Sequence, residues 1–446
     1  MNEREIQLAE MPIKKLLWRL STPAMVGMFV TAFYNIVDTI FIGRGVGVLA
    51  IAGVAIVFPI NMLVMAIEQT LGIGGSSVIS RLLGERNYSR AQLVFNNLAS
   101  FTFLSGIFLT ILILIFLKPI LVLFGATENI LPYALEYGRI IVYGISFFSF
   151  SMVGNNVVRS EGNARVAMLT MLIGAVINLI LDPIFIFVFG WGLAGAAWAT
   201  VISQSITFLY IFSYFFFGDS ILKFSWQKMK IKLNIILEIV KVGISSFFRM
   251  GSGALISIVL NNSLAVYGGD IAIATFGIIN RLISFAFLPI IGVVQGMQPI
   301  VGYNFGAGAF DRVRKTLSTS VVYTTAMSVV AFLFLFLFPR FLLRIFTDDI
   351  TALDMGTRAT RIIILAYFGI GFQMVASGMY QSLGRAAPAL FLSILRQIVL
   401  LIPLIIILPI FFYLDGIWFS FPIADFGAFV ITFFMYRRQM KKLFEK

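Results

Sequence analysis

The sequence predicts an all-α polytopic membrane protein of about twelve transmembrane helices, arranged as two pseudo-symmetric six-helix lobes. Three observations support this fold class. The 446 residues are 60% hydrophobic and 12% charged, with a mean hydropathy of +0.98, whereas soluble domains are near half apolar and a quarter charged. Apolar runs long enough to cross a bilayer recur along the chain. Features of the first half also return in the second half at a nearly constant offset.

The composition excludes several kinds of chemistry. The chain has no cysteine and no histidine, which excludes disulfides, thiolate metal sites and the usual proton-shuttling side chain. Proton chemistry must therefore use carboxylates, Tyr, Lys or water. The net charge of +13 is typical of Lys- and Arg-rich cytoplasmic loops, so we expect no nucleic-acid partner. Residues 1–20 lack the layout of a signal peptide, and we expect the first span to direct insertion.

Each predicted span is an apolar run of about 20 residues or more, the length that crosses a bilayer as a helix. The runs of the first half are Leu16–Gly43, Val48–Ile79, Leu93–Leu117, Arg139–Val158, Val166–Phe189 and Ala194–Phe217. Those of the second half are Ile239–Tyr267, Ile271–Val301, Leu317–Leu337, Ile362–Leu383, Ala389–Phe412 and Ile417–Tyr436.

The placement of Lys and Arg predicts the orientation in the membrane. With twelve spans, the basic clusters fall on one side, although Arg340, Arg344 and Arg358 fall on the other. The segment between the halves is basic and carries Lys223, Lys228, Lys230, Lys232 and Lys241. We therefore expect a cell-membrane protein with both termini in the cytoplasm. Its predicted parts are an N-lobe (1–218), a cytoplasmic basic linker (219–238) and a C-lobe (239–446).

An internal repeat divides the chain into two halves. Five pairs of matching features, from four regions, recur at a nearly constant spacing: Arg139 and Arg361, Ser160-x-Gly162 and Ser382-x-Gly384, Gly72 and Gly296, Gly84 and Gly308, and Leu49-Ala-Ile-Ala and Ile271-Ala-Ile-Ala. The separation of Arg139 from Arg361 is called the repeat offset below. An even number of spans in each half makes the repeat parallel, with its pseudo-axis along the membrane normal. Substrate sites in such folds lie near the midplane at the interface of the repeats.

Two acidic residues lie inside apolar runs of the first half. Asp182 follows Asn178 by four residues and precedes Pro183, whereas Asp38 lies in the first run after Tyr34 and Asn35. A carboxylate at the bilayer centre costs roughly 2.5–3.5 kcal/mol on insertion scales and usually marks an ion or proton pathway. Such an acid needs a partner, so we expect Asp38 and Asp182 to share one cation site. Two acids close together in low dielectric cannot both ionise cheaply.

The repeat provides a control for this interpretation. If the two acids were needed to hold six helices together, the second half should carry them as well. The repeat offset instead places Leu260 at the position of Asp38, Leu404 at that of Asp182 and Leu400 at that of Asn178. The same architecture is therefore built without the acids, which favours a functional role for them.

Several motifs resemble those of the multidrug and toxic compound extrusion (MATE) family, in its prokaryotic DinF-like branch. They are the run Gly292–Ala307 with Gln295, Gly296, Gln298, Pro299 and Asn304, then Arg159-Ser-Glu-Gly-Asn, Gly195-Ala-Ala-Trp-Ala-Thr200, and Leu395-Arg396-Gln397 before Pro403. The resemblance covers nearly the whole chain. It implies two six-helix lobes around a V-shaped central cavity. It also implies export of amphipathic, often cationic drugs in exchange for Na⁺ or H⁺, with no cofactor.

The resemblance also implies which residues bind the coupling ion. The cation-binding positions of this branch match Asp38, Asn178, Asp182 and Thr200, which would hold Na⁺ if the transporter is sodium-coupled. The polar cluster around them is matched by Tyr137 and Asn155, and Tyr34 and Asn35 belong to the same candidate set. We expect a monomer whose partners are small drug-like molecules and membrane lipids, and whose cavity is lined in part by Phe and Met.

The sequence leaves two alternative functions to consider, and it also predicts one structural ion pair. A lipid-linked precursor flippase of the same superfamily shares the two-lobe layout, but the central acids do not suit a pyrophosphate cargo. An intramembrane prenyl transferase would need clustered acids to hold Mg²⁺, and the only adjacent acids, Asp348 and Asp349, lie in a loop on the wrong side. In the second half, Arg249 or Arg396 is expected to pair with Asp425.

Overall fold

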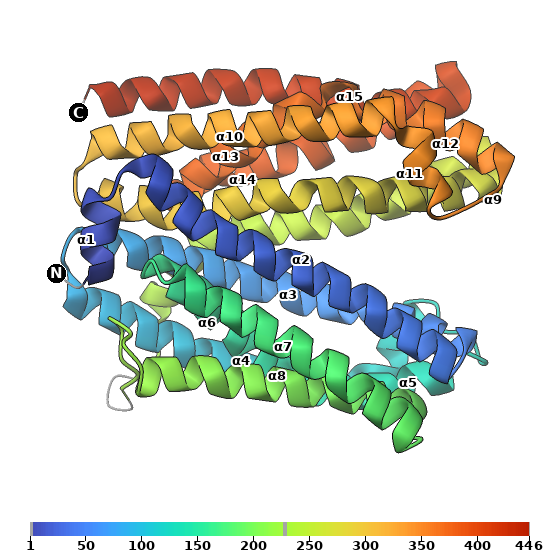
Figure 1. Ribbon diagram of the computed structural model, residues 1–446, viewed down its shortest axis with the longest axis horizontal. Helices are drawn as coiled ribbons and strands as arrows, with labels where there is room; N and C mark the ends of the chain where they lie inside the picture. The colour runs from blue at the N-terminus through green and yellow to red at the C-terminus, as the bar shows by residue number, and fades with distance from the viewer. Residues whose placement is uncertain (1–2, 226–229, 446) are drawn as a thin grey trace. The chain divides into compact units, whose positions relative to one another are not determined.

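The computed structural model describes residues 3–225 and 230–445, and every regular element in these ranges is a helix (Figure 1). Ten stretches are long and apolar enough to cross a membrane. Leu233–Gly306 and Ala386–Leu443, with 74 and 58 residues, would be about 110 and 90 Å long as single helices, against a hydrocarbon core of about 30 Å. Each contains one residue with positive φ, Gly269 at 64° and Tyr413 at 50°, so each crosses twice. The all-α polytopic class is confirmed.

The chain forms two compact units, one from the described residues of 1–9 and 22–243 and one from those of 10–21 and 244–446. The elements of the first unit are α1 (Glu3–Glu10), most of α2 (Ile13–Gly45), α3 (Val48–Gly84), α4 (Tyr88–Leu123), α5 (Leu131–Ile141), η1 (Val142–Gly144), α6 (Ile145–Ser160), α7 (Ala164–Pro183), η2 (Ile184–Val188), α8 (Gly192–Phe216) and the start of α9 (Leu233–Gly306).

The second unit contains the rest of α9 and the first turns of α2. Its further elements are α10 (Phe310–Leu337), α11 (Pro339–Arg344), α12 (Ile350–Ile363), η4 (Ile364–Gly369), α13 (Ile370–Ser382), α14 (Ala386–Ile394), η5 (Leu395–Leu401) and α15 (Ile402–Phe444). Of the predicted basic linker, Lys228 lies outside the described residues.

The backbone repeats itself at the repeat offset. Residues with positive φ recur in the pairs Gly47 and Gly269, Arg86 and Gly308, and Gly162 and Gly384. The 3₁₀ turns η1 and η4 also begin at equivalent positions, Val142 and Ile364. The predicted match of Gly84 with Gly308 is therefore wrong by two positions, because the left-handed turn lies at Arg86. The repeat itself is present in the backbone and not only in the sequence.

The starts of α2 and α9 each belong to a different unit from the rest of the helix. The unit boundary falls after Ser21 in α2 and after Gly243 in α9, which are equivalent positions of the repeat. Glycines allow the close packing at both places. A Cβ on Gly74 would lie 2.1 Å from the Ile239 carbonyl oxygen, and one on Gly296 would lie 2.3 Å from the Ser21 hydroxyl. Gly74, not the predicted Gly72, is thus the equivalent of Gly296.

We expect a Gly243→Ala substitution to destabilise the first unit by about 1–3 kcal/mol, as overpacking does in well-packed cores. A Cβ at this position would lie 1.8 Å from the Thr70 carbonyl oxygen of α3, and a backbone atom cannot move aside as a flexible side chain can. The measurement is the thermal unfolding midpoint of the detergent-purified protein. Gly277→Ala is the matched control, because its Cβ meets nothing within 4 Å. Equal midpoints for both variants would contradict the requirement for this close approach.

Polar side chains cap several helices. Asn87, Asn163 and Asp349 cap α4, α7 and α12 by accepting backbone N–H groups of Arg90, Val166 and Ala352, at 3.1, 3.3 and 2.8 Å. These bonds satisfy donors that the first turn of a helix leaves free. Asp349, one of the two adjacent acids noted in the sequence, is therefore a helix cap.

The predicted ion pair of the second unit is confirmed, with Arg396 as the cation. Its guanidinium contacts Asp425, which is 3% exposed. The Gln373 side chain donates to the Asp425 backbone carbonyl at 3.0 Å. The pair connects η5, α13 and α15. Removing one member of such a buried pair usually costs about 3–5 kcal/mol.

Candidate functional site

The two acids singled out in the sequence lie together in the first unit. Asp38 comes from the second half of α2, and Asp182 from the last turn of α7, where it is 0% exposed. Their carboxyl groups are neighbours and can share one proton. Pro183 ends α7 and is followed by the π-helical turn η2. Since proline lacks the N–H needed to continue the hydrogen-bond pattern, the sequence itself places this irregular turn directly after the acid.

Asn178 joins Asp182 to the neighbouring helix. Its side-chain N–H₂ group donates to the Asp182 carboxylate and to the Thr200 hydroxyl of α8, both at 3.3 Å. Thr200 in turn donates to the Ala196 carbonyl at 3.1 Å. The hydroxyls of Tyr137 and Tyr34 complete the surroundings of the two acids, with Tyr137 beside Thr200. The cluster therefore takes side chains from α2, α5, α7 and α8.

Three oxygen atoms of this cluster are buried without a hydrogen-bond partner: Asp38 Oδ1, Asp182 Oδ2 and Asn178 Oδ1. Among the described residues, neither acid forms an ion pair with Lys or Arg. Buried oxygen acceptors with no donor are unfavourable. They become favourable when a proton or a hard cation binds, because hard cations prefer oxygen ligands. In the part of the chain that the structure describes, no group of three or more acidic, His or Cys side chains is placed to hold a metal ion.

Two of the predicted residues lie elsewhere. Asn155 donates to the Ala167 carbonyl at 2.7 Å and accepts from Arg159 at 2.5 Å. Ala167 is eleven residues before Asn178 in α7, which is about 16 Å along a helix, so Asn155 is not at the cluster. The exposed Asn35 side chain donates to the Thr31 carbonyl of its own helix at 2.8 Å. The structure thus brings together Tyr34, Asp38, Tyr137, Asn178, Asp182 and Thr200.

The equivalent positions in the second unit also lie together, and there they are apolar. At the repeat offset from Tyr34, Asp38, Tyr137, Asn178 and Asp182 lie Ile256, Leu260, Ala359, Leu400 and Leu404, and all five belong to or pack against one hydrophobic cluster. The fold therefore places these positions side by side in both units. One unit fills them with aliphatic side chains, and the other fills them with acids, amides and hydroxyls. Helix packing does not require the polar set.

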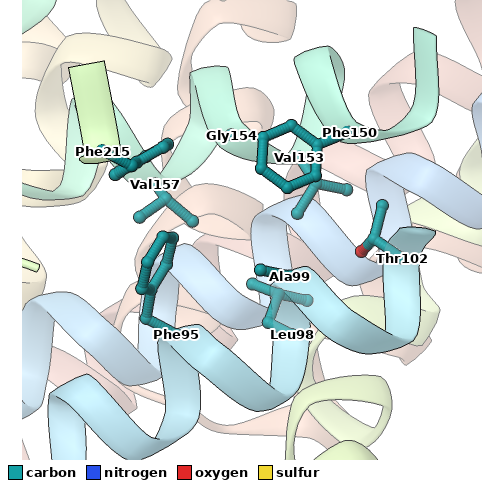
Figure 2. Close-up of a pocket in the computed structure, with 9 residues that line it drawn as sticks. All are labelled: Phe95, Leu98, Ala99, Thr102, Phe150, Val153, Gly154, Val157 and Phe215. Atoms are coloured by element: carbon teal, nitrogen blue, oxygen red, sulfur yellow. The ribbon is translucent and has the colours of Figure 1, made fainter. Parts of the chain in front are cut away.

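Two cavities differ in size and lining. Within the first unit, a cavity of about 10 Å³ lies between α4, α6 and α8 (Figure 2), enough for about one water molecule. Within the second unit, a cavity of about 660 Å³ has an almost entirely apolar lining, in the size range of small-molecule sites. Its larger lining residues include Trp18, Phe285, Tyr323, Met327, Phe334 and Phe346. Aromatic and Met side chains of this kind suit apolar ligands of varied shape.

Sequence reasoning missed the role of one buried acid outside the spans. Glu161 is 0% exposed in the turn between α6 and α7. It accepts the hydroxyls of Tyr214 and Ser220 and the backbone N–H of Leu222, at 2.7, 2.6 and 2.9 Å. Arg4 of α1 lies 4.0 Å away. A signal was available, since Arg159-Ser-Glu-Gly-Asn is one of the motifs that resemble the MATE family.

Comparison with known proteins supports the family. The MatE family model matches residues 23–184 and 245–407, two blocks in the same register as the repeat and together more than half of the chain. The multidrug export protein MepA of Staphylococcus saprophyticus is 30% identical over 417 residues, covering 92% of this chain and 90% of that protein.

Two solved structures share the fold at 28% identity. One is a MOP superfamily transporter from Pyrococcus furiosus, described as having a binding pocket of reversed polarity that suggests a different function (TM-score 0.92, 98% of each chain). The other is a MATE protein in complex with MaL6 (TM-score 0.93, 99% of each chain). The chain belongs to the MATE family of multi-pass membrane proteins, whose members are transporters and not enzymes.

Proposed function

We propose that this protein exports amphipathic, often cationic drugs from the cell, and that the inward movement of H⁺ or Na⁺ drives the export. Similarity to multidrug export proteins supports the reaction class. The cavity of the second unit, with its apolar and aromatic lining, supports an amphipathic cargo. The protein is proposed to lie in the cell membrane with both termini in the cytoplasm, because the basic segments cluster on that side.

The coupling ion is proposed to bind at Asp38 and Asp182. The observation that carries this proposal is the acid pair, with Asp182 buried and Asp38 partly exposed, which together with Asn178 presents three buried, unpartnered oxygens. The second unit fills the equivalent positions with leucine. Asn178 and Thr200 would orient the Asp182 carboxylate and add neutral oxygen ligands. A proton shared by the two carboxyl groups, or a Na⁺ between them, would satisfy the same atoms.

Coupling requires that the ion and the drug favour different arrangements of the protein. A ligand can shift a conformational equilibrium only through its different affinities for the two states. With one H⁺ or Na⁺ bound, the two carboxyl groups carry one negative charge fewer and are less unfavourable to keep away from water. Without it, the pair carries uncompensated charge, which favours an arrangement open to water or to a cationic drug. Ion binding from one side and drug binding from the other would then alternate.

The test uses purified protein in liposomes loaded with a fluorescent cationic dye. A pH gradient and a sodium gradient are imposed in separate experiments, with ionophore controls that collapse each gradient. We expect one of the two gradients to drive dye transport against its concentration difference. Transport by neither gradient would overturn the coupling proposal. Dye transport by both would indicate that the oxygen set accepts either ion.

A further inference from the structure

Glu68 is a further buried acid of the first unit, separate from the pair. It lies in the apolar helix α3 and is 0% exposed. Neither of its carboxylate oxygens has a hydrogen-bond partner, and Glu68 forms none of the ion pairs found among the described residues. An ionised carboxylate in such surroundings is strongly unfavourable, whereas the protonated acid is neutral.

The surroundings of Glu68 contain one polar group from another helix. The hydroxyl of Ser149 in α6 lies beside it; Ser149 is also 0% exposed and without a hydrogen-bond partner. Among the residues that the structure describes, no charged side chain adds to these surroundings. The titratable residues on α3 and on the neighbouring elements of the first unit are Arg81, Glu85, Tyr88, Arg90, Lys118, Tyr133, Glu136, Tyr137, Arg139, Tyr143, Arg159, Glu238 and Lys241. The described part of the chain therefore places no cation at Glu68 to balance a negative charge.

Glu68 lies well away from the Asp38–Asp182 pair along the axis of α3. Val57 of α3 packs against Gly138, the neighbour of Tyr137 at the pair. Glu68 follows Val57 by eleven residues, and Ser149 follows Tyr137 by twelve, which gives about 16 and 18 Å at about 1.5 Å per helical residue. The spacing along α3 and the spacing along α5 and α6 thus give similar distances between Glu68 and the acid pair. The displacement is toward the end of α3 that carries Arg81, on the basic side of the chain.

The repeat again shows that packing does not need an acid here. The residue at the repeat offset from Glu68 is Ile290, which is 0% exposed in the hydrophobic cluster of the second unit. A glutamic acid in place of an aliphatic residue adds one capability, the binding and release of a proton. Placing a glutamic acid inside a membrane span is energetically unfavourable, and ionisable residues in spans usually have a function.

We propose that Glu68 is a second proton-binding site of the first unit, and that its proton is released and regained in each transport cycle. The site would extend the path of the coupling proton from Asp38 and Asp182 toward the basic side of the membrane. This inference rests on the proposed function and specifies its proton-coupled form. On release, the O–H bond of the carboxyl group breaks and a water molecule takes the proton as H₃O⁺, and on uptake H₃O⁺ returns the proton to the carboxylate.

The test compares Glu68→Gln with Glu68→Asp in dye-loaded proteoliposomes under a pH gradient. Glutamine is isosteric with the protonated acid but cannot release a proton, so we expect at least a tenfold loss of transport. Aspartate keeps a titratable group and should retain a measurable part. The matched control is Glu238→Gln, which removes a partly exposed acid paired with Arg90 in the same unit and should transport like the wild type. Wild-type transport by Glu68→Gln would overturn the inference.

A second measurement keeps the inference testable if the variants fail to fold. A hydrophobic carbodiimide reacts with protonated carboxyl groups in apolar surroundings, and mass spectrometry locates the labelled residue in the wild-type protein. We expect labelling of Glu68 that falls as the pH rises and changes when dye binds. No labelling at any pH, or labelling that dye leaves unchanged, would overturn the inference. Normal transport by Glu68→Gln together with loss of transport in Asp182→Asn would overturn the inference and leave the proposed function intact.

Discussion

Replacing Asp182 by asparagine should abolish ion-driven drug efflux and leave the protein folded. The Asn side chain keeps the size of the carboxyl group. Its oxygen can still accept a hydrogen bond from the side-chain N–H₂ group of Asn178, which lies 3.3 Å from the Asp182 carboxylate in the wild-type protein. The asparagine side chain cannot take up a proton, and it has no negative charge to balance that of Na⁺. Asp38→Asn should have the same effect, because its carboxyl group faces that of Asp182. The measurement is gradient-driven dye efflux, with loss to the level of empty liposomes.

The matched control for both variants is Asp354→Asn. This acid pairs with Arg340 at 3.0 Å on an exposed surface, with side chains 59% and 51% exposed, where ion pairs contribute little. We expect wild-type efflux from it. The monodispersity and unfolding midpoint of each purified variant show whether it is folded. Normal efflux by Asp38→Asn and Asp182→Asn would exclude the acid pair as the coupling site.

Replacing Glu161 by alanine should cause a large loss of stability. The substitution removes the buried acceptor of the Tyr214 hydroxyl and leaves the Ser220 hydroxyl and the Leu222 N–H only the hydrogen bonds between residues 220 and 222. A buried unsatisfied donor costs about 1–3 kcal/mol. Arg4 loses its contact with Glu161 but keeps its hydrogen bonds to the Tyr214 hydroxyl at 2.7 Å and the Asp219 carbonyl at 3.0 Å, so we expect α1 to stay on the end of α8. The measurement is the unfolding midpoint of the purified protein, with the exposed Glu128→Ala as control. Equal midpoints for the two variants would contradict the structural role of Glu161.

The same residue should make stability depend on pH. Burial raises the pKa of Glu161 above its ordinary value of 4.5, although hydrogen bonds from Ser220, Tyr214 and Leu222 and the charge of Arg4 oppose this shift. The folded state then binds the proton more tightly than the unfolded state does. The resulting stabilisation is present below the unfolded pKa and is lost as the pH rises through the folded pKa. The unfolding midpoint should therefore fall across this window in the wild type, and less so in Glu161→Gln.

The course of the chain through the membrane could be predicted because hydropathy and length act locally. The boundaries could not always be placed. The spans that meet at Tyr413 are joined through a single non-helical residue, where the apolar runs suggested a longer loop. The transfer of residues 10–21 to the second unit also has no local signal, because α2 continues as one helix through the boundary.

The candidate site was predictable where a physical requirement linked its residues. An acid in a low-dielectric environment needs a polar partner. Asp38 and Asp182 both lie inside apolar runs of the first half, so each was predicted to be the partner of the other. Asn155 was matched by residue type alone, and its amide satisfies Ala167 and Arg159. Glu161 lies in a turn, outside the apolar runs in which an acid is conspicuous. The lack of a partner for Glu68 depends on which side chains the neighbouring helices present to it, and that requires the packed structure.

The most direct test of the central claim is the affinity of the purified protein for a cationic dye, measured over a range of pH and Na⁺ concentration. If the ion and the drug favour opposite states, each must lower the affinity of the protein for the other by the same factor. The account predicts that dye affinity falls in the wild type as the coupling ion is added. It also predicts that the Asp38→Asn, Asp182→Asn double variant binds dye with an affinity independent of the ion. Full ion dependence in the double variant would contradict it.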